Sequence, residues 1–304
     1  MYKLLIIISL ILISFFQNPI ISLSIGLVTG FILKNNLKDF IKYVGSKPLQ
    51  TGIVLIGFSI NFGTFSDLLL NYFPVISIFV VLTFILGLLI GRFFNLDTKF
   101  VYLISSATAI CGATAALAIS SIIKAKPNQI SLAIFIIFLM NTIALVVFPI
   151  TGRFIGLTDM QFGLFSALAI HDTGSVVGSG LLFSEDAAEI AATLKVGRTI
   201  WILPLIALVT YKMNDNGSVD LNHFPKFIIF FFIAIVISNL FNLPIQVYDM
   251  SKLLSIVFIN IGIFFIALQT KVEKINNLSN LIYPVFLWVT VILISFIVIT
   301  SLYS

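Results

Sequence analysis

Charged residues are scarce in this chain of 304 residues. They make up 10% of the sequence, apolar residues make up 60%, and the mean hydropathy is +1.16. A soluble globular domain carries roughly a quarter charged residues, so the composition excludes that class. The net charge of +5 is modest, and the basic residues stand between apolar runs instead of forming a stripe, which argues against a nucleic-acid partner. The composition is that of a membrane protein.

Cysteine and catalytic motifs are also nearly absent. The single cysteine, Cys111, forbids an intrachain disulfide. The sequence contains no phosphate-binding Gly-Lys-Ser/Thr loop and no His-Glu-x-x-His motif, and its two histidines and one cysteine cannot form a metal cluster. We therefore expect no enzyme, no cofactor and no metal site. An ATP-driven pump is excluded too, because the chain has no room for a nucleotide-binding domain.

Long apolar runs dominate what is present. A bilayer-spanning helix needs about 20 mostly apolar residues, and about eleven such runs predict an all-α polytopic protein embedded in the lipid bilayer. We interpret residues 4–33 as two short helices, with one long helix kinked at Pro19 as the alternative. The predicted spans are residues 4–16, 20–33, 48–70, 73–94, 100–123, 130–150, 162–183, 187–211, 224–243, 253–270 and 281–302.

The basic residues predict the orientation. With eleven spans, 12 of the 17 lie on the amino-terminal side and 5 on the other. Because cytoplasmic loops are rich in Lys and Arg, we expect the amino terminus in the cytoplasm and the carboxyl terminus outside. Spans two to six and seven to eleven predict two five-helix units, which insert in opposite orientations because five is odd. The predicted organisation is an extra helix at 1–18, a first repeat at 19–157 and an inverted repeat at 158–304.

Residues 105–116 contain only one large side chain. One interpretation is a helix broken near Gly112, whose half-helix start offers free backbone amides to an anion. The alternative is close helix packing through small residues. A fainter interruption at residues 260–262, Asn-Ile-Gly, predicts a second broken helix that faces the first at the bilayer midplane.

Polar groups inside other apolar runs are further candidates, since such groups are costly in hydrocarbon. His171 and Asp172 could carry a coupling proton or bind a cation, or could form a structural pair. Asn141 could line the cavity or hold two helices together. Lys195 and Arg198 begin the eighth span and could snorkel to the interface, or Arg198 could point inward to an oxyanion.

Several of these pieces occur together in the order and spacing of a known family. They are residues 52–58 (Gly-Ile-Val-Leu-Ile-Gly-Phe), residues 110–113 (Ile-Cys-Gly-Ala), His171-Asp172 with Val176-Val177, and Lys195-x-x-Arg198 followed by Pro204. With them the chain resembles the YeiH-type family of bacterial inner-membrane proteins, to which sulfate export is assigned at the family level. The resemblance covers most of residues 48–211. It implies a place among the bile-acid/sodium symporter-like and sodium/proton antiporter-like transporters, with inverted five-helix repeats and two crossing, broken helices.

The chain departs from the family pattern at four positions. It has Asp172 where the family usually has Glu and Ser175 where the family has Gln. It has Gln50 and Ser59 where the family typically has Arg. Losing two cationic contacts bears directly on which substrate is carried.

These observations predict a secondary transporter for a small anion such as sulfate, sulfite or an organosulfonate, coupled to protons or sodium. A cation/proton antiporter that uses Asp172 as its ion site is the alternative, and a non-transporting structural or sensory protein is a third. The oligomeric state stays open, with a homodimer among the options. The predicted substrate site comprises Thr108, Cys111, Gly112, Ala113, Thr114, Ser175, Arg198, Asn260 and Gly262, and the predicted coupling-ion site comprises His171, Asp172 and Asn141.

Overall fold

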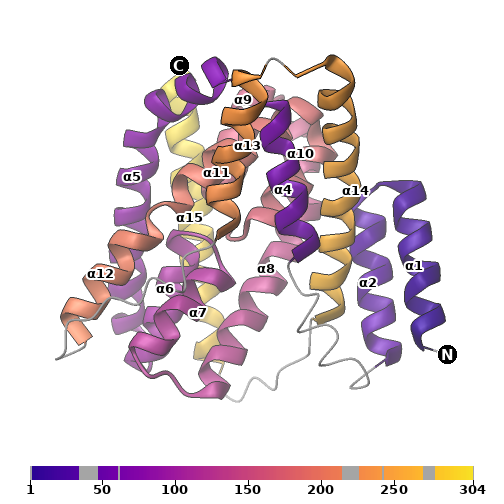
Figure 1. The fold of residues 1–304 in the computed structure, drawn as a ribbon. Coiled ribbons are helices and arrows are strands. Elements are labelled where there is room, and N and C mark those ends of the chain that lie inside the picture. Colours follow the sequence, from indigo (N-terminus) through magenta and orange to yellow (C-terminus); the bar gives the residue numbers. More distant parts are fainter. Residues whose placement is uncertain are drawn as a thin grey trace.

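The computed structural model describes residues 2–33, 47–60, 62–213, 226–241, 243–269 and 278–303, and all regular structure in these ranges is helical (Figure 1). Five segments are long and apolar enough to cross a membrane: Phe65–Phe93, Pro127–Phe154, Glu185–Lys212, Ile245–Phe265 and Ser279–Leu302. The helices are α1 (Tyr2–Phe16), α2 (Pro19–Leu33), α4 (Lys47–Ser59), α5 (Phe62–Phe93), α6 (Thr98–Ala109), α7 (Ala113–Ile122), α8 (Pro127–Phe154), α9 (Asp159–Ala169), α10 (Thr173–Phe183), α11 (Glu185–Thr199), α12 (Ile202–Met213), α13 (Lys226–Leu240), α14 (Ile245–Gln269) and α15 (Ser279–Tyr303).

The first 33 residues form two helices, as the sequence predicted. Gln17 has a φ of 47°, and the side-chain oxygen of Asn18 accepts the backbone N–H of Ile20 at 2.9 Å, which caps the start of α2. The chain reverses there, so α1 and α2 lie side by side (Figure 1). The hydroxyls of Ser9 and Thr29 lie 3.4 Å apart between them.

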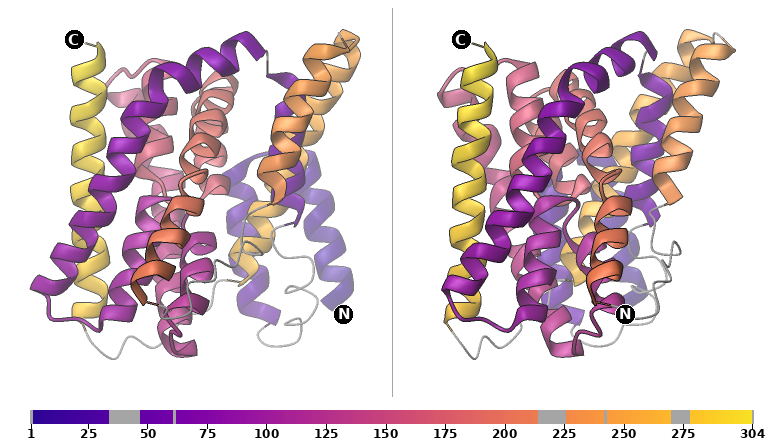
Figure 2. Two further views of the ribbon diagram at one scale, coloured as in Figure 1. Left: turned by 60° about the vertical axis from the view of Figure 1, so that its left-hand side comes forward. Right: turned by 90° about the vertical axis from the view of Figure 1, so that its left-hand side faces the viewer.

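The predicted boundary between residues 70 and 73 is wrong. Helix α5 runs unbroken through that region and bends in its first part (Figure 2), as expected for a helix that contains Pro74. The break falls earlier, between α4 and α5. There Asn239 of α13 accepts the N–H of Phe62 at 2.9 Å and donates to the carbonyl of Ile60 at 3.0 Å. This side chain satisfies backbone groups that the break would otherwise leave unpaired.

Helices α6 and α7 form a re-entrant hairpin, here called hairpin 1. The Lys99 ammonium, at the start of α6, donates to the carbonyl of Lys124, just after α7, at 2.8 Å. The two outer ends of the hairpin therefore lie together. Helix α6 has 12 residues, which is about 18 Å at 1.5 Å per residue and only about half of a hydrocarbon core. The segment 100–123 thus turns back near Gly112 and does not cross the bilayer as predicted.

Helices α9 and α10 form hairpin 2 in the same way. The Ser184 hydroxyl donates to the Asp159 carboxylate at 2.5 Å, and the rings of Phe162 and Phe183 stack 4.1 Å apart at the outer ends. Arg153, at the end of α8, donates to the carbonyl of Phe183 at 2.8 Å. Hairpin 1 enters beside the start of α8 and hairpin 2 beside its end, so they come from opposite sides of the bundle (Figure 1).

The two hairpins carry an internal repeat at an offset of 60 residues. Residues 106, 107, 109 and 110 (Ser, Ala, Ala, Ile) are identical to residues 166, 167, 169 and 170. Both serine hydroxyls donate to the carbonyl four residues earlier, at 2.6 and 2.7 Å. A long helix follows each hairpin, α8 after the first and the segment Glu185–Lys212 after the second. This sequence repeat is shorter than the predicted five-helix units, and the inverted repeats and the division at 1–18, 19–157 and 158–304 remain predictions.

The second predicted interruption is also wrong, because α14 runs unbroken through residues 260–262. Gly262 is a packing glycine: a Cβ there would lie 2.5 Å from the Cβ of Leu49 on α4. The amide oxygen of Asn260 accepts the Ser22 hydroxyl at 2.9 Å and so joins α14 to α2. Small residues let these backbones approach closely.

The described helices fall into two bundles. A side bundle contains α1, α2, α4, α13 and α14, and a main bundle contains α5 to α12 and α15. Figure 2 shows them standing beside each other. They touch mainly through α10 and α14, and Lys252 of α14 also pairs with Glu185 and Glu189 of α11 at 3.0 and 3.4 Å. The first and last described residues lie at opposite ends of the molecule (Figure 1).

The hairpin topology predicts a labelling pattern. Replacing Cys111 with Ala removes the only cysteine, and Lys99→Cys and Lys124→Cys are then introduced one at a time. We expect a membrane-impermeant maleimide to label both positions from the same side in intact cells or inverted vesicles. Labelling from opposite sides would show that residues 100–123 cross the bilayer.

Candidate functional site

The tips of the two hairpins meet in the middle of the main bundle. Gly112, at the tip of hairpin 1, has a φ of +64°, a conformation that L residues rarely adopt. A Cβ at Gly112 would lie 3.3 Å from both the Cβ and the backbone nitrogen of Asp172 at the tip of hairpin 2. Asn141 contacts the same tip and lies near the middle of α8. The two tips therefore meet at a level about halfway along α8.

Two buried basic side chains of α11 donate hydrogen bonds to the backbone carbonyls at the ends of α6 and α9, which are the first helices of the two hairpins. Arg198 is 1% exposed and Lys195 is 0% exposed. The Lys195 ammonium donates to the carbonyl of Ile170 at 2.6 Å. The Arg198 guanidinium donates to Ala109 at 2.8 Å, Ala167 at 2.8 Å, Leu168 at 2.7 Å and Ile170 at 3.3 Å, and also to Thr108.

These contacts follow from helix chemistry. The last turn of a helix leaves carbonyls without intrahelical partners and carries partial negative charge. Helices α6 and α9 both end at the tips, inside the protein. Arg198 and Lys195 supply donors and positive charge there, and the indole of Trp288 on α15 adds a donor to the carbonyl of Ala169 at 3.0 Å.

The other two helices begin at the tips and present their positive ends. Helix α7 starts at Ala113 and α10 at Thr173. The Asp172 carboxylate caps α10 by accepting the backbone N–H of Ser175 at 2.9 Å. Thr114 is exposed and Ala113 is part-exposed, so the start of α7 is accessible from outside the protein. Asp172 is part-exposed, but Thr173, Gly174 and Ser175 at the start of α10 are buried. Free N–H groups at a helix start favour an anion.

The hydrogen bonds of Asn141 define the chemistry of His171. The side-chain oxygen of Asn141 accepts the backbone N–H of His171 at 3.1 Å and lies 3.0 Å from the ring Nδ1. Because that oxygen can only accept, Nδ1 must carry a proton. In the neutral ring the lone pair is then on Nε2, to which no described residue donates a hydrogen bond. Nε2 is thus a free base at the hairpin tips.

Several polar atoms here are buried and have no partner within the described part of the chain. They are Thr108 Oγ1, Asn141 Nδ2, His171 Nε2 and Asp172 Oδ2. Leaving a buried polar group unpaired costs about 1–3 kcal/mol, and native structures contain few such groups. Four of them around one meeting point indicate a place for a ligand, an ion or water.

The structure brings most of the predicted site residues together. Gly112 and Asp172 are in contact, and Arg198 points inward and does not snorkel. Its donors are directed to backbone carbonyls, so it supports the site through the hairpins. Thr108, Cys111, Ala113, Thr114, His171, Ser175 and Asn141 all belong to the hairpin tips or contact them. Asn260 and Gly262 do not, because α14 uses them for packing.

Sequence reasoning left Lys195 without a role and missed Trp288. A lysine at an apolar helix start could equally snorkel, and only the fold shows that Lys195 ends on the carbonyl of Ile170. Gln50, where the family typically has Arg, lines a surface pocket with Lys47 and Lys226. Nothing is described of the Ser59 side chain. Among the described residues, no group of three or more His, Cys, Asp or Glu could hold a metal ion.

Comparison with known proteins identifies the family. A family model described as Conserved hypothetical protein 698 matches residues 4–283. A UPF0324 membrane protein of Vibrio parahaemolyticus is 34% identical over 291 residues, which cover 91% of this chain and 92% of the relative. The chain belongs to the UPF0324 family of membrane proteins. The YeiH-type family that the motifs resembled is this same UPF0324 family.

Other UPF0324 relatives match a similar share of this chain. A UPF0324 membrane protein of Bacteroides thetaiotaomicron is 34% identical over 280 residues, covering 90% of this chain and 84% of the relative. One from Streptococcus agalactiae is 29% identical over 295 residues, covering 91% and 88%. No solved structure matches the chain.

The role of Arg198 can be tested by stability. Arg198→Gln leaves several buried carbonyls without a hydrogen-bond donor, and each costs about 1–3 kcal/mol. We therefore expect the free energy of unfolding to fall by at least about 3 kcal/mol, with a clearly lower thermal unfolding midpoint in detergent. Arg153→Gln is the matched control, because Arg153 also donates to two carbonyls, of Leu182 and Phe183, but at an exposed position. Equal midpoints for the two variants would contradict the assigned role.

Proposed function

We propose that this UPF0324 protein is a secondary transporter of a small anion such as sulfate, sulfite or an organosulfonate. One observation carries the proposal: the start of α7 is accessible at the hairpin tips, and the buried side chains of Arg198 and Lys195 add positive charge there. Backbone N–H groups at this helix start would bind the oxyanion. This binding mode is consistent with the absence of the two arginines that the family carries at Gln50 and Ser59.

His171 and Asp172 would couple transport to protons. His171 Nε2 is a lone-pair base, and Asp172 Oδ2 can accept a proton or contribute to a sodium site. A proton taken up at either group lowers the negative charge at the tips or raises the positive charge. Anion binding and protonation would therefore strengthen each other, as linkage requires.

A cation/proton antiporter remains the second candidate. The buried, unpartnered Asp172 Oδ2 favours it, since a carboxylate oxygen suits a sodium ion. Arg198 and Lys195 oppose it, because they add two positive charges beside the carboxylate. This balance makes the anion the favoured substrate.

The two-bundle arrangement supports alternating access. The main bundle contains both hairpins, and it meets the side bundle across an apolar core in which Leu145, Val177 and Ala192 cluster with Ile53 and Ile259. A rigid movement of one bundle against the other would expose the tips to each side in turn. The exposed pair between Lys252 and Glu185 would contribute at most about 1 kcal/mol to either state, so it would not block such a movement.

The distribution of basic residues supports an inner-membrane orientation with the amino terminus in the cytoplasm. Six described basic residues lie toward the end of the bundle at which α1 starts, and two lie toward the other. The re-entrant hairpins sharpen the asymmetry, because they move Lys124 and Lys126 to the first end. The six are Lys3, Arg92, Lys99, Lys124, Lys126 and Lys212, and the two are Arg153 and Lys252.

Flux measurements on purified protein in liposomes test the proposal. We expect wild type to carry labelled sulfate or sulfite, with a dependence on an imposed pH or sodium gradient. Asp172→Asn should abolish the coupled flux while the protein still folds, and His171→Gln should shift the pH dependence. Asp67→Asn removes an exposed carboxylate elsewhere and should leave transport unchanged.

Two results would contradict this account. Normal transport by Asp172→Asn with an unchanged pH dependence would make the His171–Asp172 pair structural. Sodium flux without any anion flux would establish the antiporter instead.

A pair of glycine variants separates backbone strain from the site. Gly112→Ala and Gly156→Ala both place a side chain at positive φ, at about 1–2 kcal/mol each, but a Cβ at Gly156 meets nothing within 4 Å. We expect similar losses of stability, and a loss of sulfate binding by calorimetry only in Gly112→Ala, which crowds Asp172. Gly112→Val is unsuitable for this test because a β-branched residue is strained at this φ. Equal binding by both alanine variants would place the site elsewhere.

A further inference from the structure

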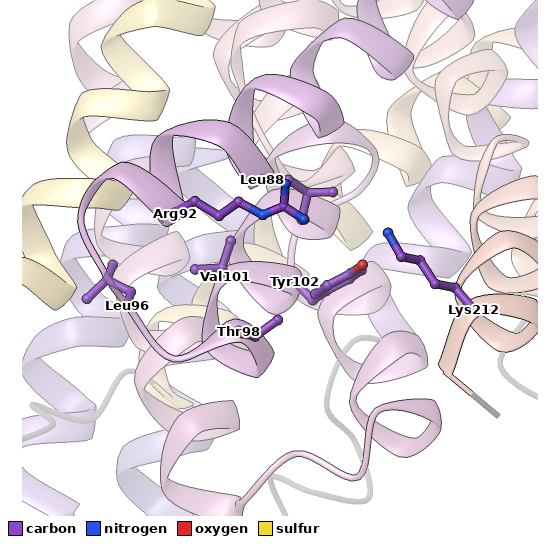
Figure 3. A pocket seen from close by; sticks show the side chains of 7 residues that line it. All are labelled: Leu88, Arg92, Leu96, Thr98, Val101, Tyr102 and Lys212. Atoms are coloured by element: carbon purple, nitrogen blue, oxygen red, sulfur yellow. The ribbon is translucent and has the colours of Figure 1, made fainter.

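A second polar pocket lies far along α6 from the hairpin tip, at the outer end of hairpin 1. It has a volume of about 180 Å³ and is lined by the ends of α5 and α12 and the start of α6 (Figure 3). The lining residues are Leu88, Arg92, Leu96, Thr98, Val101, Tyr102 and Lys212.

The pocket carries positive charge without a matching carboxylate. Arg92 and Lys212 come from different helices, and their charged ends point toward the hydroxyl side of Tyr102 (Figure 3). No residue that lines the pocket is acidic, and neither cation forms an ion pair with a described residue. Such a pair of cations is a recognition element for an anion.

Tyr102 supplies an independent polar group. Its side chain is 4% exposed, and its ring is held by an edge contact with Phe84 at 6.1 Å between centroids. No described residue hydrogen-bonds its hydroxyl, which is directed into the pocket (Figure 3). The hydroxyl is not among the fully buried unpartnered atoms of the described residues, so it is accessible from the pocket and can donate to a ligand oxygen.

The pocket lies at the level where lipid headgroups are found. Arg92 and Lys212 stand in the last turns of the membrane-spanning segments Phe65–Phe93 and Glu185–Lys212. The aromatic neighbours Phe93 and Tyr211 are 82% and 91% exposed. Exposed aromatic residues at span ends are typical of the membrane interface, and basic pockets between helices at this level bind anionic headgroups.

We propose that this pocket binds the phosphate group of an anionic phospholipid. Arg92 and Lys212 contact the phosphate oxygens, the Tyr102 hydroxyl donates to one of them, and the acyl chains lie along the apolar faces of α5 and α12. The lipid is thereby bound at the base of hairpin 1. The site is separate from the hairpin tips, and its existence does not depend on which substrate the protein carries.

Native mass spectrometry of the purified protein tests the proposal. Phosphatidylglycerol and phosphatidylethanolamine are titrated separately, and inorganic phosphate is titrated in a third arm. We expect retention of phosphatidylglycerol that Arg92→Gln/Lys212→Gln weakens roughly 30-fold, since each basic residue near a membrane surface contributes about 1 kcal/mol. Tyr102→Phe should weaken it by a smaller factor.

The matched control removes the same charge elsewhere. Lys47→Gln/Lys226→Gln deletes two lysines that line another surface pocket, and phosphatidylglycerol binding should change less than threefold. If the two double variants weaken phosphatidylglycerol binding equally, the lipid is attracted by the general surface charge and not by this pocket, and the proposal is overturned. Tight binding of inorganic phosphate with no preference for phosphatidylglycerol over phosphatidylethanolamine would overturn the lipid as the source.

Discussion

Four helix ends meet inside this membrane protein, and the backbone carbonyls that two of them leave unpaired are satisfied by buried side chains. Arg198 and Lys195 do this for the two ends that expose carbonyls, α6 and α9. Without these donors, two re-entrant hairpins could not end in the interior, because irregular backbone at membrane depth is tolerated only where protein or a water-filled cavity satisfies it. The placement of Gly112, His171 and Asp172 depends on this arrangement.

The same arrangement separates the charges that a transporter needs. The negative ends of α6 and α9 face two buried cations, and the positive end of α7 faces an accessible region. Asp172 has two roles in this arrangement. One carboxylate oxygen caps α10, and the other has no hydrogen-bond partner among the described residues. The negative charge of a bound anion and the positive charge of a proton at His171 or Asp172 would thus offset each other, so each would favour the binding of the other.

The sequence predicted the break at Gly112 and pointed to His171 and Asp172 as candidates, because small or ionisable residues inside an apolar run are visible without a structure. It could not show that the chain reverses at those breaks. A 24-residue apolar segment has the same composition whether it spans a membrane or folds into two half-length helices. The position of Lys124 depends on that choice, and so does the count of spans.

Other failures have equally physical reasons. Asn260 and Gly262 resemble a helix break in sequence, yet Gly262 serves the close approach of Leu49. The inward direction of Arg198 depends on carbonyls about 30 and 90 residues away in the chain, which no local pattern encodes. The 60-residue repeat was present in the sequence but is shorter than the five-helix unit that was sought.

The most direct test of the central claim is protection of the hairpin tip by an anion. In a Cys111→Ala background, Thr114→Cys places a thiol at the exposed start of α7, and its alkylation rate is measured by a small water-soluble reagent. The account predicts that sulfate or sulfite slows alkylation in a saturable way at constant sodium concentration, whereas replacement of sodium by potassium has no effect. A rate that no oxyanion changes, or that only sodium lowers, would contradict an anion site at the hairpin tips.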